Sequence, residues 1–175
     1  MDFQTAKQYD DEYIIHSYGR FPVLLTKGKG ATVQDDTGKT YIDFTSGIGV
    51  NALGFCDDNW VQAVSAQLQT LQHTSNLYYT EPCIQAAKLL CEKSSMKKVF
   101  FGNSGAEANE GVIKAARKYS FLKYGASRNK IIALQNSFHG RTMAALSATG
   151  QDAYHNFFFP FVDGFVCLLY TSPSP

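Results

Sequence analysis

The stretch KVFFGNSGAEANEGVIKAARKYSFLKYGASRNKIIAL, residues 98–134, decides the fold class. It opens with a short apolar segment at residues 98–101 and closes with another at residues 130–134, and both are typical of buried strands. Gly102 ends the first strand, and the residues that follow predict a long helix over residues 105–124. A strand, a long helix and a strand make a βαβ unit, which requires parallel pairing and a right-handed crossover. The sequence therefore predicts an α/β fold.

The long helix is expected to have one buried face and a defined end. Its apolar residues recur at helical spacing and predict a buried stripe of Ala108, Val112, Ala115, Tyr119 and Leu122. Gly125 suits the end of the helix, because glycine readily adopts the left-handed conformation found after many helices. The helix is therefore expected to pack through this stripe.

The segments before residue 98 predict shorter elements. Short strands are expected at residues 22–25, 31–34 and 40–44. Residues 35–39 (DDTGK) have the chemistry of a hairpin turn between the last two strands. One helix is expected after Asp57 or Asp58, either of which can cap it, and a second after residues 80–82, where proline falls in the first turn.

Length, composition and charge are those of an ordinary globular protein. The chain has 175 residues, is 45% hydrophobic and 18% charged, and carries a formal net charge of +1. These values exclude disorder, collagen, coiled coil and charge-driven binding to nucleic acid. Its apolar runs fall short of the roughly 20 residues of a membrane span, its start is too polar for a signal peptide, and its four cysteines form no CxxC pair. We therefore expect a cytoplasmic protein with reduced cysteines and no membrane or nucleic-acid partner.

Residues 103–107 (NSGAE), between the first strand and the long helix, predict a phosphate-binding site. Ser104 and Glu107 have the spacing of a capping box, which fixes the first helical turn. Gly105 has no Cβ, so an anion can approach backbone N–H groups at the positive end of the helix dipole. The alternative is an ordinary capped helix. The position at the carboxyl end of a parallel strand favours a ligand site.

Residues 137–142 (SFHGRT) follow the second strand at the corresponding end. Phe138 could stack on a planar ring, and the guanidinium of Arg141 could bind a carboxylate through two parallel hydrogen bonds. Core packing is the alternative for Phe138, and a solvated helix start is the alternative for Arg141. His139 is assigned no role.

Two glycine-containing segments imitate nucleotide-binding motifs. Residues 47–52 fit G-x-G-x-x-A after a predicted strand, but residues 53–56 break any helix there and residues 66–73 contain no acid for a ribose. Residues 28–30 lack the glycine spacing and the following Ser or Thr of a P-loop. Neither NAD binding nor nucleotide hydrolysis is expected.

Several motifs together resemble the class III pyridoxal-phosphate-dependent aminotransferases. They are residues 18–23 (YGRFPV), 27–30 (KGKG), 38–44 (GKTYIDF), 47–54 (GIGVNALG), 103–110 (NSGAEANE) and 138–142 (FHGRT). The resemblance covers about residues 18–166, and it accounts for the glycines of residues 47–52 as a family motif. Residues 55–59 (FCDDN) depart from the run that usually follows in this family.

The resemblance implies a fold-type I large domain, pyridoxal 5'-phosphate as cofactor, and roles for four residues. Gly105 and Ala106 would donate backbone N–H groups to the cofactor phosphate, Phe138 would stack on the pyridine ring, and Arg141 would bind the substrate α-carboxylate. The Schiff-base lysine and the aspartate that partners the pyridinium nitrogen lie beyond residue 175 in the family. No catalytic residue and no metal ligand is therefore assigned in this chain.

Within the family, the sequence is similar to the members that transfer the side-chain amino group of N-acetylornithine to 2-oxoglutarate in arginine biosynthesis. The implied partners are an amino donor, a 2-oxo acid acceptor and a second copy of the enzyme in a homodimer with active sites at the subunit interface. Two alternatives stay open. One is an aminotransferase for ornithine or another ω-amino acid, and the other is a non-catalytic phosphate-ligand or interaction module.

Three regions are expected along the chain. Residues 1–56 form an N-terminal segment with short strands, a hairpin and a glycine-rich loop, and residues 57–166 form part of the large domain that binds the cofactor. Residues 167–175 have no periodicity and are expected to be a non-native tail. Because family members are roughly twice this length or more, the chain is expected to be a fragment that is inactive alone.

Overall fold

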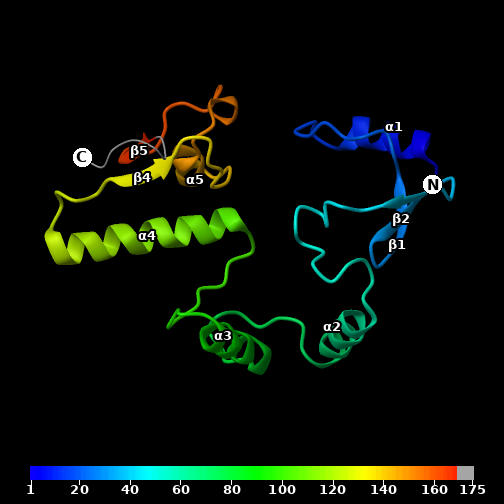
Figure 1. The fold of residues 1–175 in the computed structure, drawn as a ribbon, viewed down its shortest axis with the longest axis horizontal. Helices are drawn as coiled ribbons and strands as arrows, with labels where there is room; N and C mark the ends of the chain where they lie inside the picture. Colours follow the sequence, from blue (N-terminus) through cyan, green and yellow to red (C-terminus); the bar gives the residue numbers. More distant parts are fainter. Residues whose placement is uncertain (169–175) are drawn as a thin grey trace. The chain divides into compact units, whose positions relative to one another are not determined.

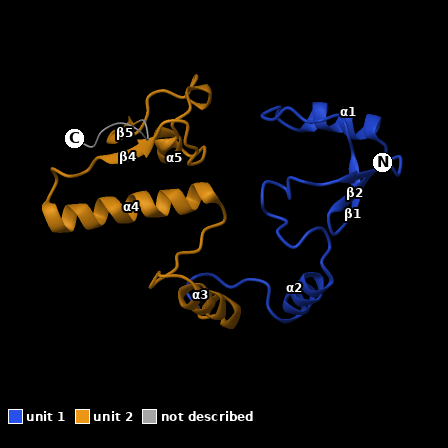
Figure 2. Cartoon of the chain, viewed as in Figure 1, with its two compact units in different colours: residues 1–78 blue, residues 79–175 orange. Residues whose placement is uncertain are grey.

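The computed structural model describes residues 1–168 of the chain, which is divided into two compact units (Figures 1 and 2). The first unit spans residues 1–78 and the second residues 79–175. The helix expected after Asp57 thus falls in the first unit, whereas the sequence predicts a boundary between regions after residue 56. The predicted regions describe domains of the whole enzyme and stay a prediction.

The first unit contains an antiparallel sheet of three strands in the order β1, β2, β3. The strands are β1 (Leu25–Lys29), β2 (Thr32–Asp35) and β3 (Thr40–Ile42). The predicted hairpin between the second and third strands is confirmed. The first strand was expected at residues 22–25, but it begins where that prediction ends. Leu25 pairs with Asp35, the last residue of β2, so β1 cannot extend back along β2 over residues 22–24.

A helix at the start of the chain, α1 (Phe3–Tyr13), was not predicted. The Asp2 carboxylate caps α1 by accepting the Thr5 N–H at 2.8 Å. Asp36, in the turn after β2, accepts the N–H of Phe3 at 2.7 Å. Because none of its residues is buried, this helix lacks the apolar stripe on which sequence-based prediction depends.

The next two helices begin where the sequence predicts. They are α2 (Asp58–Thr70) in the first unit and α3 (Glu81–Lys93) in the second. The Asp57 carboxylate caps α2 by accepting the Trp60 N–H at 2.9 Å. Proline lies in the first turn of α3, where its missing N–H costs no helical hydrogen bond. The N-terminus of each helix is determined by residues next to it in the sequence, which explains why both helix starts can be predicted from the sequence.

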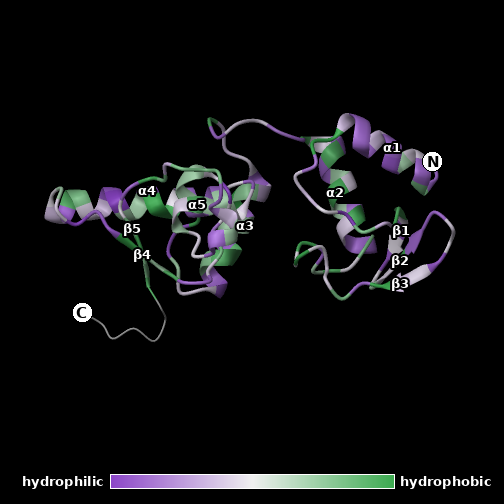
Figure 3. Cartoon of the chain, turned by 90° about the horizontal axis from the view of Figure 1, so that it is seen from above, coloured by the Kyte–Doolittle hydropathy of each residue, from purple (hydrophilic) through white to green (hydrophobic). Residues whose placement is uncertain are grey.

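The rest of the second unit is a mixed helix and strand arrangement around a parallel pair of strands. Its elements are α4 (Gly105–Tyr124), β4 (Ile131–Leu134), α5 (Met143–Ala148), the 3-10 turn η1 (Asp152–Tyr154) and β5 (Phe165–Leu168). β4 and β5 pair in parallel, and both are mainly hydrophobic (Figure 3). A parallel pair needs a crossover, which α5 and η1 provide here. The predicted α/β class is therefore confirmed, with a different strand as the partner of β4.

The strand predicted at residues 98–101 is wrong for this chain. A strand needs a neighbour to take its backbone hydrogen bonds, and no strand of the described residues pairs with this segment. Instead, Phe100 lies against α4, where a Cβ on Gly111 would come within 2.9 Å of its ring. β5 is not predicted from the sequence, and its last two residues fall within the tail expected at residues 167–175. The remainder of that tail, residues 169–175, lies outside the described residues.

The covered face of α4 also differs from the prediction. All members of the predicted stripe are exposed, namely Ala108, Val112, Ala115, Tyr119 and Leu122. The covered face instead carries Asn109, Ile113 and Arg117, of which Ile113 is 7% exposed. The guanidinium of Arg117 donates to the carbonyl of Asp163 at 2.6 Å, just before β5. Asn109 and Arg117 thus face the rest of the unit because they hydrogen-bond to distant loops, and a pattern of apolar residues cannot predict such contacts.

The core of the second unit is small and lies between β4, α5 and α4. Its buried apolar residues are Ile113, Ala133, Ala145, Leu146 and Ala148. Thr149, directly after α5, is also buried, at 1% exposure. Within residues 1–168, no helix is both long and apolar enough to cross a membrane.

Candidate active site

The start of α4 presents backbone donors to open space. Ser104 caps the helix by accepting the Glu107 N–H at 3.2 Å, and the Glu107 carboxylate in turn accepts the Asn103 N–H. The N–H groups of Gly105 and Ala106 donate to no acceptor within residues 1–168. Nothing beyond the local helix backbone lies within 4 Å of the position of a Cβ on Gly105. These donors, at the positive end of the helix dipole, fit a phosphate group.

The loop after β4, residues 137–142, lies directly against this helix start. Gly140 has a φ of 127°, a conformation that favours glycine. A Cβ on Gly140 would lie 2.7 Å from the Cβ of Ala106 and 3.2 Å from that of Ala145. The structure therefore brings together the two segments that the sequence predicts to bind one ligand set.

Two side-chain hydrogen bonds join the loop to α4. The amide of Asn109 donates to the carbonyl of His139 at 2.6 Å. The hydroxyl of Thr142 donates to the carboxylate of Glu110 at 2.6 Å. Asn109 and Glu110, which belong to the motif at residues 103–110, thus hold the loop against α4.

Phe138 and Arg141 share a neighbour, Tyr154 of η1. The rings of Phe138 and Tyr154 have centroids 5.3 Å apart, with an angle of 58° between their planes. The guanidinium carbon of Arg141 lies 5.4 Å from the centroid of the Tyr154 ring. Phe138 is 52% exposed, so it is not packed in the core. Tyr154, for which the sequence predicts no role, therefore contacts both the predicted ring-binding side chain and the predicted carboxylate-binding side chain.

The segment after α5 holds the loop in place through Thr149 and Gly150. The Gly150 N–H donates to the Ser137 carbonyl at 3.1 Å, and the Gly150 carbonyl accepts the Asn136 N–H at 2.7 Å. A Cβ on Gly150 would overlap the carbonyl oxygen of Leu134, at the end of β4. From the sequence, a Thr-Gly pair after a short apolar segment indicates a turn. It does not indicate which other loop of the protein that turn will contact.

The glycine-rich segment at residues 47–52, in the first unit, contains no helix. The backbone has positive φ values at Gly47, Ile48 and Gly49, and the next helix, α2, begins only at Asp58. A dinucleotide motif requires a helix N-terminus at its glycines. The segment lacks that geometry.

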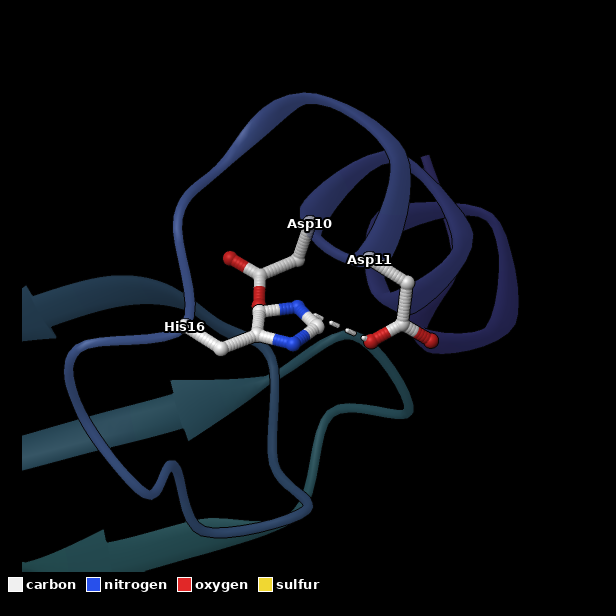
Figure 4. A group of neighbouring side chains, drawn as sticks. All are labelled: Asp10, Asp11 and His16. Atoms are coloured by element: carbon white, nitrogen blue, oxygen red, sulfur yellow. Dashed lines mark ion pairs between the residues drawn. The ribbon is translucent and has the colours of Figure 1, made fainter.

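Three side chains of types that can bind metal ions lie close together at and just after the end of α1, namely Asp10, Asp11 and His16 (Figure 4). Asp11 pairs with Lys7 at 2.7 Å and with His16 at 3.4 Å, while Asp10 pairs with Arg20 at 3.1 Å. Basic side chains thus already compensate both carboxylates, and Asp11 and His16 are exposed. The group is a surface ion-pair network, and we assign it no metal.

Comparison with known proteins identifies the family to which this fold belongs. The family model described as aminotransferase class-III matches residues 13–174, almost the whole chain. The chain belongs to the class III aminotransferase family.

Its relatives include enzymes named acetylornithine aminotransferase. The one from Haemophilus ducreyi is 57% identical over 169 residues, which cover 97% of this chain and 43% of the relative. The one from Caldanaerobacter subterraneus is 53% identical over 157 residues, which cover 90% of this chain and 40% of the relative. The chain thus spans about two-fifths of the length of these relatives.

Solved transaminase structures share the fold. An ornithine aminotransferase from Toxoplasma gondii superposes with a TM-score of 0.91 at 30% identity, over 96% of this chain and 40% of that one, and has partial occupancy of PLP at its active site. An ω-transaminase from Pseudomonas jessenii, in complex with PMP, superposes with a TM-score of 0.84 at 32% identity, over 92% and 38% of the two chains. The predicted fold-type I architecture is therefore confirmed for the part that the chain contains.

Proposed function

We propose that the chain forms part of a pyridoxal 5'-phosphate-dependent aminotransferase and carries contacts to both cofactor and substrate. In this proposal, the N–H groups of Gly105 and Ala106 bind the cofactor phosphate, Phe138 lies against the pyridine ring, and Arg141 binds the substrate α-carboxylate. The close approach of Gly140 to Ala106 carries the proposal, because it joins the phosphate donors and the ring-binding loop in one site. Membership of the family supports the choice of cofactor.

When bound, pyridoxal phosphate supplies an electron sink for breaking bonds at the amino-bearing carbon. The described residues bind and orient the reacting groups. At the start of α4, the open N–H groups of Gly105 and Ala106 hold an anion without a charged side chain. The hydrogen bonds made by Ser104 and Glu107 fix this turn in advance. The phosphate contact therefore costs little reorganisation.

Arg141 suits a carboxylate because of its geometry as well as its charge. A guanidinium presents two parallel N–H groups that match the two oxygens of a carboxylate. Arg141 directly precedes Thr142, the N-cap of α5, and its guanidinium carbon lies 5.4 Å from the centroid of the Tyr154 ring. A ring at this distance attracts the cation without offering a hydrogen-bond acceptor to its N–H groups.

For the substrates, we propose N-acetylornithine as amino donor and 2-oxoglutarate as acceptor. The relatives at 53–57% identity carry the name acetylornithine aminotransferase, which supports this donor over ornithine. The likeness to the ornithine aminotransferase fold does not distinguish the donors, since one fold serves several substrates. A cytoplasmic homodimer without nucleic-acid or membrane partners belongs to the same proposal.

The test is a comparison of amino donors in a full-length enzyme that contains this sequence. With 2-oxoglutarate as acceptor, glutamate formation is measured with N-acetylornithine and with ornithine. We expect kcat/KM to be at least about tenfold higher for N-acetylornithine, since a pocket for the acetyl amide discriminates against a donor that lacks it. A preference for ornithine would support the ornithine aminotransferase alternative. No glutamate from any donor, together with no cofactor binding, would support the non-catalytic module.

A further inference from the structure

Thr149 is the only polar residue below 2% exposure in the described chain, and its hydroxyl makes contacts on two sides. The oxygen accepts the N–H of His139 at 3.0 Å. It also lies 3.2 Å from the carbonyl of Gly140 and 3.1 Å from that of Ala145, either of which can accept its single proton. A buried hydroxyl used as both donor and acceptor is fully satisfied, so it strongly favours one arrangement of its neighbours.

The Thr149 hydroxyl bonds to the backbone of the two residues that separate Phe138 from Arg141, the two side chains to which the proposed function assigns ligand contacts. His139 and Gly140 are the only residues separating Phe138 from Arg141. The rings of Tyr154 and Phe138 are in contact, but the other hydrogen bonds from the segment after α5 to this loop reach no further than Ser137, which accepts from Gly150 at 3.1 Å. From that segment, therefore, the Thr149 hydroxyl alone reaches the backbone between Phe138 and Arg141.

The same backbone is held from the opposite side by α4. Asn109 donates to the carbonyl of His139 at 2.6 Å, so both polar backbone groups of His139 are bonded, one to α4 and one to Thr149. The next residue, Gly140, lies against Ala106 at the start of α4. A rotation of the backbone at His139 would therefore move Phe138 and Arg141 relative to the phosphate donors.

We propose that Thr149 is a positioning residue for the cofactor and substrate site. Its hydroxyl fixes the backbone of His139 and Gly140, so that Phe138 and Arg141 project from a loop of defined conformation beside Gly105 and Ala106. This inference rests on the proposed function for the ligands, while the bonds themselves are properties of the fold. It requires a hydroxyl at residue 149, because a side chain of the same shape without one would leave the part-buried N–H of His139 without its acceptor.

The experiment uses a full-length enzyme that contains this sequence, with Thr149→Val, Thr149→Ser and the control Ser147→Ala. Ser147 is a close match to Thr149, since its hydroxyl also accepts a distant backbone N–H, that of Val162 at 2.9 Å, and donates to a carbonyl four residues earlier, that of Met143 at 2.7 Å. It touches no residue of the loop in these bonds. The control therefore reports the effect of losing a hydroxyl from α5 without disturbing the proposed site.

The first readout is amide hydrogen exchange at single-residue resolution in the cofactor-free enzyme. We expect His139 to exchange about tenfold faster in Thr149→Val, the size expected for one lost hydrogen bond, and within about twofold of wild type in Thr149→Ser. Ser147→Ala should accelerate exchange at Val162 and leave His139 unchanged. Unchanged exchange of His139 in Thr149→Val would overturn the inference.

The second readout separates positioning from simple stability. Thr149→Val should weaken binding of pyridoxal phosphate and raise KM for the amino donor, each by about tenfold, while Thr149→Ser restores both. If Thr149→Val does not fold, Thr149→Ala removes the same hydroxyl with less side-chain volume and is compared with Thr149→Ser in the same way. A folded variant that lacks the hydroxyl but has wild-type cofactor affinity and KM would overturn this inference and leave the proposed function standing. A wild-type enzyme that binds no pyridoxal phosphate would instead overturn the proposed function.

Discussion

Gly105, the first residue of α4, is the position where a substitution best separates a cofactor contact from a helix contact. Since a Cβ there meets nothing within 4 Å, the protein itself has room for a side chain. We expect Gly105→Val in the full-length enzyme to fold normally and to bind pyridoxal phosphate at least about tenfold more weakly, because the side chain would occupy the approach to the N–H groups. Circular dichroism follows the fold, and titration of the cofactor follows binding.

Gly105→Ala is the graded control for this prediction. Alanine is the better helix former by about 1 kcal/mol, so a purely structural role predicts a neutral or slightly stabilising effect. A well-folded Gly105→Val enzyme with wild-type cofactor affinity would contradict the assignment of the phosphate to Gly105 and Ala106.

At Arg141, the informative substitution keeps the positive charge and removes the two parallel N–H groups of the guanidinium. We expect Arg141→Lys to lower kcat/KM for the amino donor by about 10- to 150-fold, equivalent to about 1.5–3 kcal/mol for a charged hydrogen bond. Affinity for pyridoxal phosphate should change much less, because Arg141 is assigned to the substrate. Steady-state kinetics with a parallel cofactor titration make this comparison. Unchanged kcat/KM would remove Arg141 from the site.

Among the elements, the β2–β3 hairpin depends on one carboxylate. Asp35 accepts the Thr37 hydroxyl at 2.7 Å and the Tyr41 hydroxyl at 2.8 Å, together with the N–H groups of Thr37 and Lys39 at 3.0 Å each. Hydrogen bonds from Thr37 and then Tyr41 lower the pKa of Asp35 to about 2. Because the folded form binds this proton less readily than the unfolded form, the carboxylate stabilises the hairpin above about pH 4.

That contribution should be lost as the pH falls from about 4 to about 2. We expect exchange of the Lys39 amide, after correction for its intrinsic pH dependence, to accelerate through this window. Asp35→Ala should accelerate it already at neutral pH, by about tenfold or more, and abolish the acid transition. Asp36→Ala is the control, since Asp36 accepts only the distant N–H of Phe3. An acid transition that persists in Asp35→Ala would show that another group controls the hairpin.

The elements also show what a sequence can predict. The starts of α2, α3 and α4 were predicted because their signals, Asp57, Pro82 and Ser104, act within a few residues. The contact between residues 137–142 and the start of α4 was also anticipated, because both segments follow apolar stretches expected to be neighbouring strands. Only the second of those stretches is a strand here, and Gly140 makes the contact directly.

Features that depend on distant partners were not predictable in the same way. Residues 98–101 have the composition of a strand, but composition supplies no neighbour to pair with. The pairing of β4 with β5 joins Ile131 to Phe165, far apart in the sequence, and the hydroxyl of the buried Thr149 bonds ten residues back, to the N–H of His139. Periodicity selected the most apolar face of α4, whereas the face that packs contains Asn109 and Arg117, whose bonding partners lie in distant loops.

The difference in burial between the two faces of α4 predicts a difference in how much substitutions on them reduce stability. Ile113 is 7% exposed and Val112, its neighbour on the predicted stripe, is 61% exposed. In the 175-residue chain, we expect Ile113→Ala to reduce the free energy of unfolding by about 2–3 kcal/mol and Val112→Ala by less than about 0.5 kcal/mol. Denaturant titration at protein concentrations below those at which the chain associates measures both. Equal losses would mean that the predicted stripe is also buried in solution.

For the whole molecule, the exposure of large apolar side chains is the most informative property. Ile48, Tyr79 and Phe157 are each more than 95% exposed, an unusual state for large apolar side chains. Phe21 and Phe44 are each 90% exposed. Both units therefore present large apolar side chains on their surfaces.

This surface predicts how the 175-residue chain behaves when it is produced alone. Exposed apolar area on this scale favours association, so we expect species larger than a monomer at micromolar concentration and strong binding of a hydrophobic dye such as ANS. A full-length enzyme that contains this sequence is the control, and it should bind much less dye per residue if the rest of its fold covers these side chains. Sedimentation velocity and dye fluorescence measure the two effects. A chain that is monomeric at micromolar concentration and binds no dye would contradict the prediction, because residues such as Phe157 would then have to be covered within the chain itself.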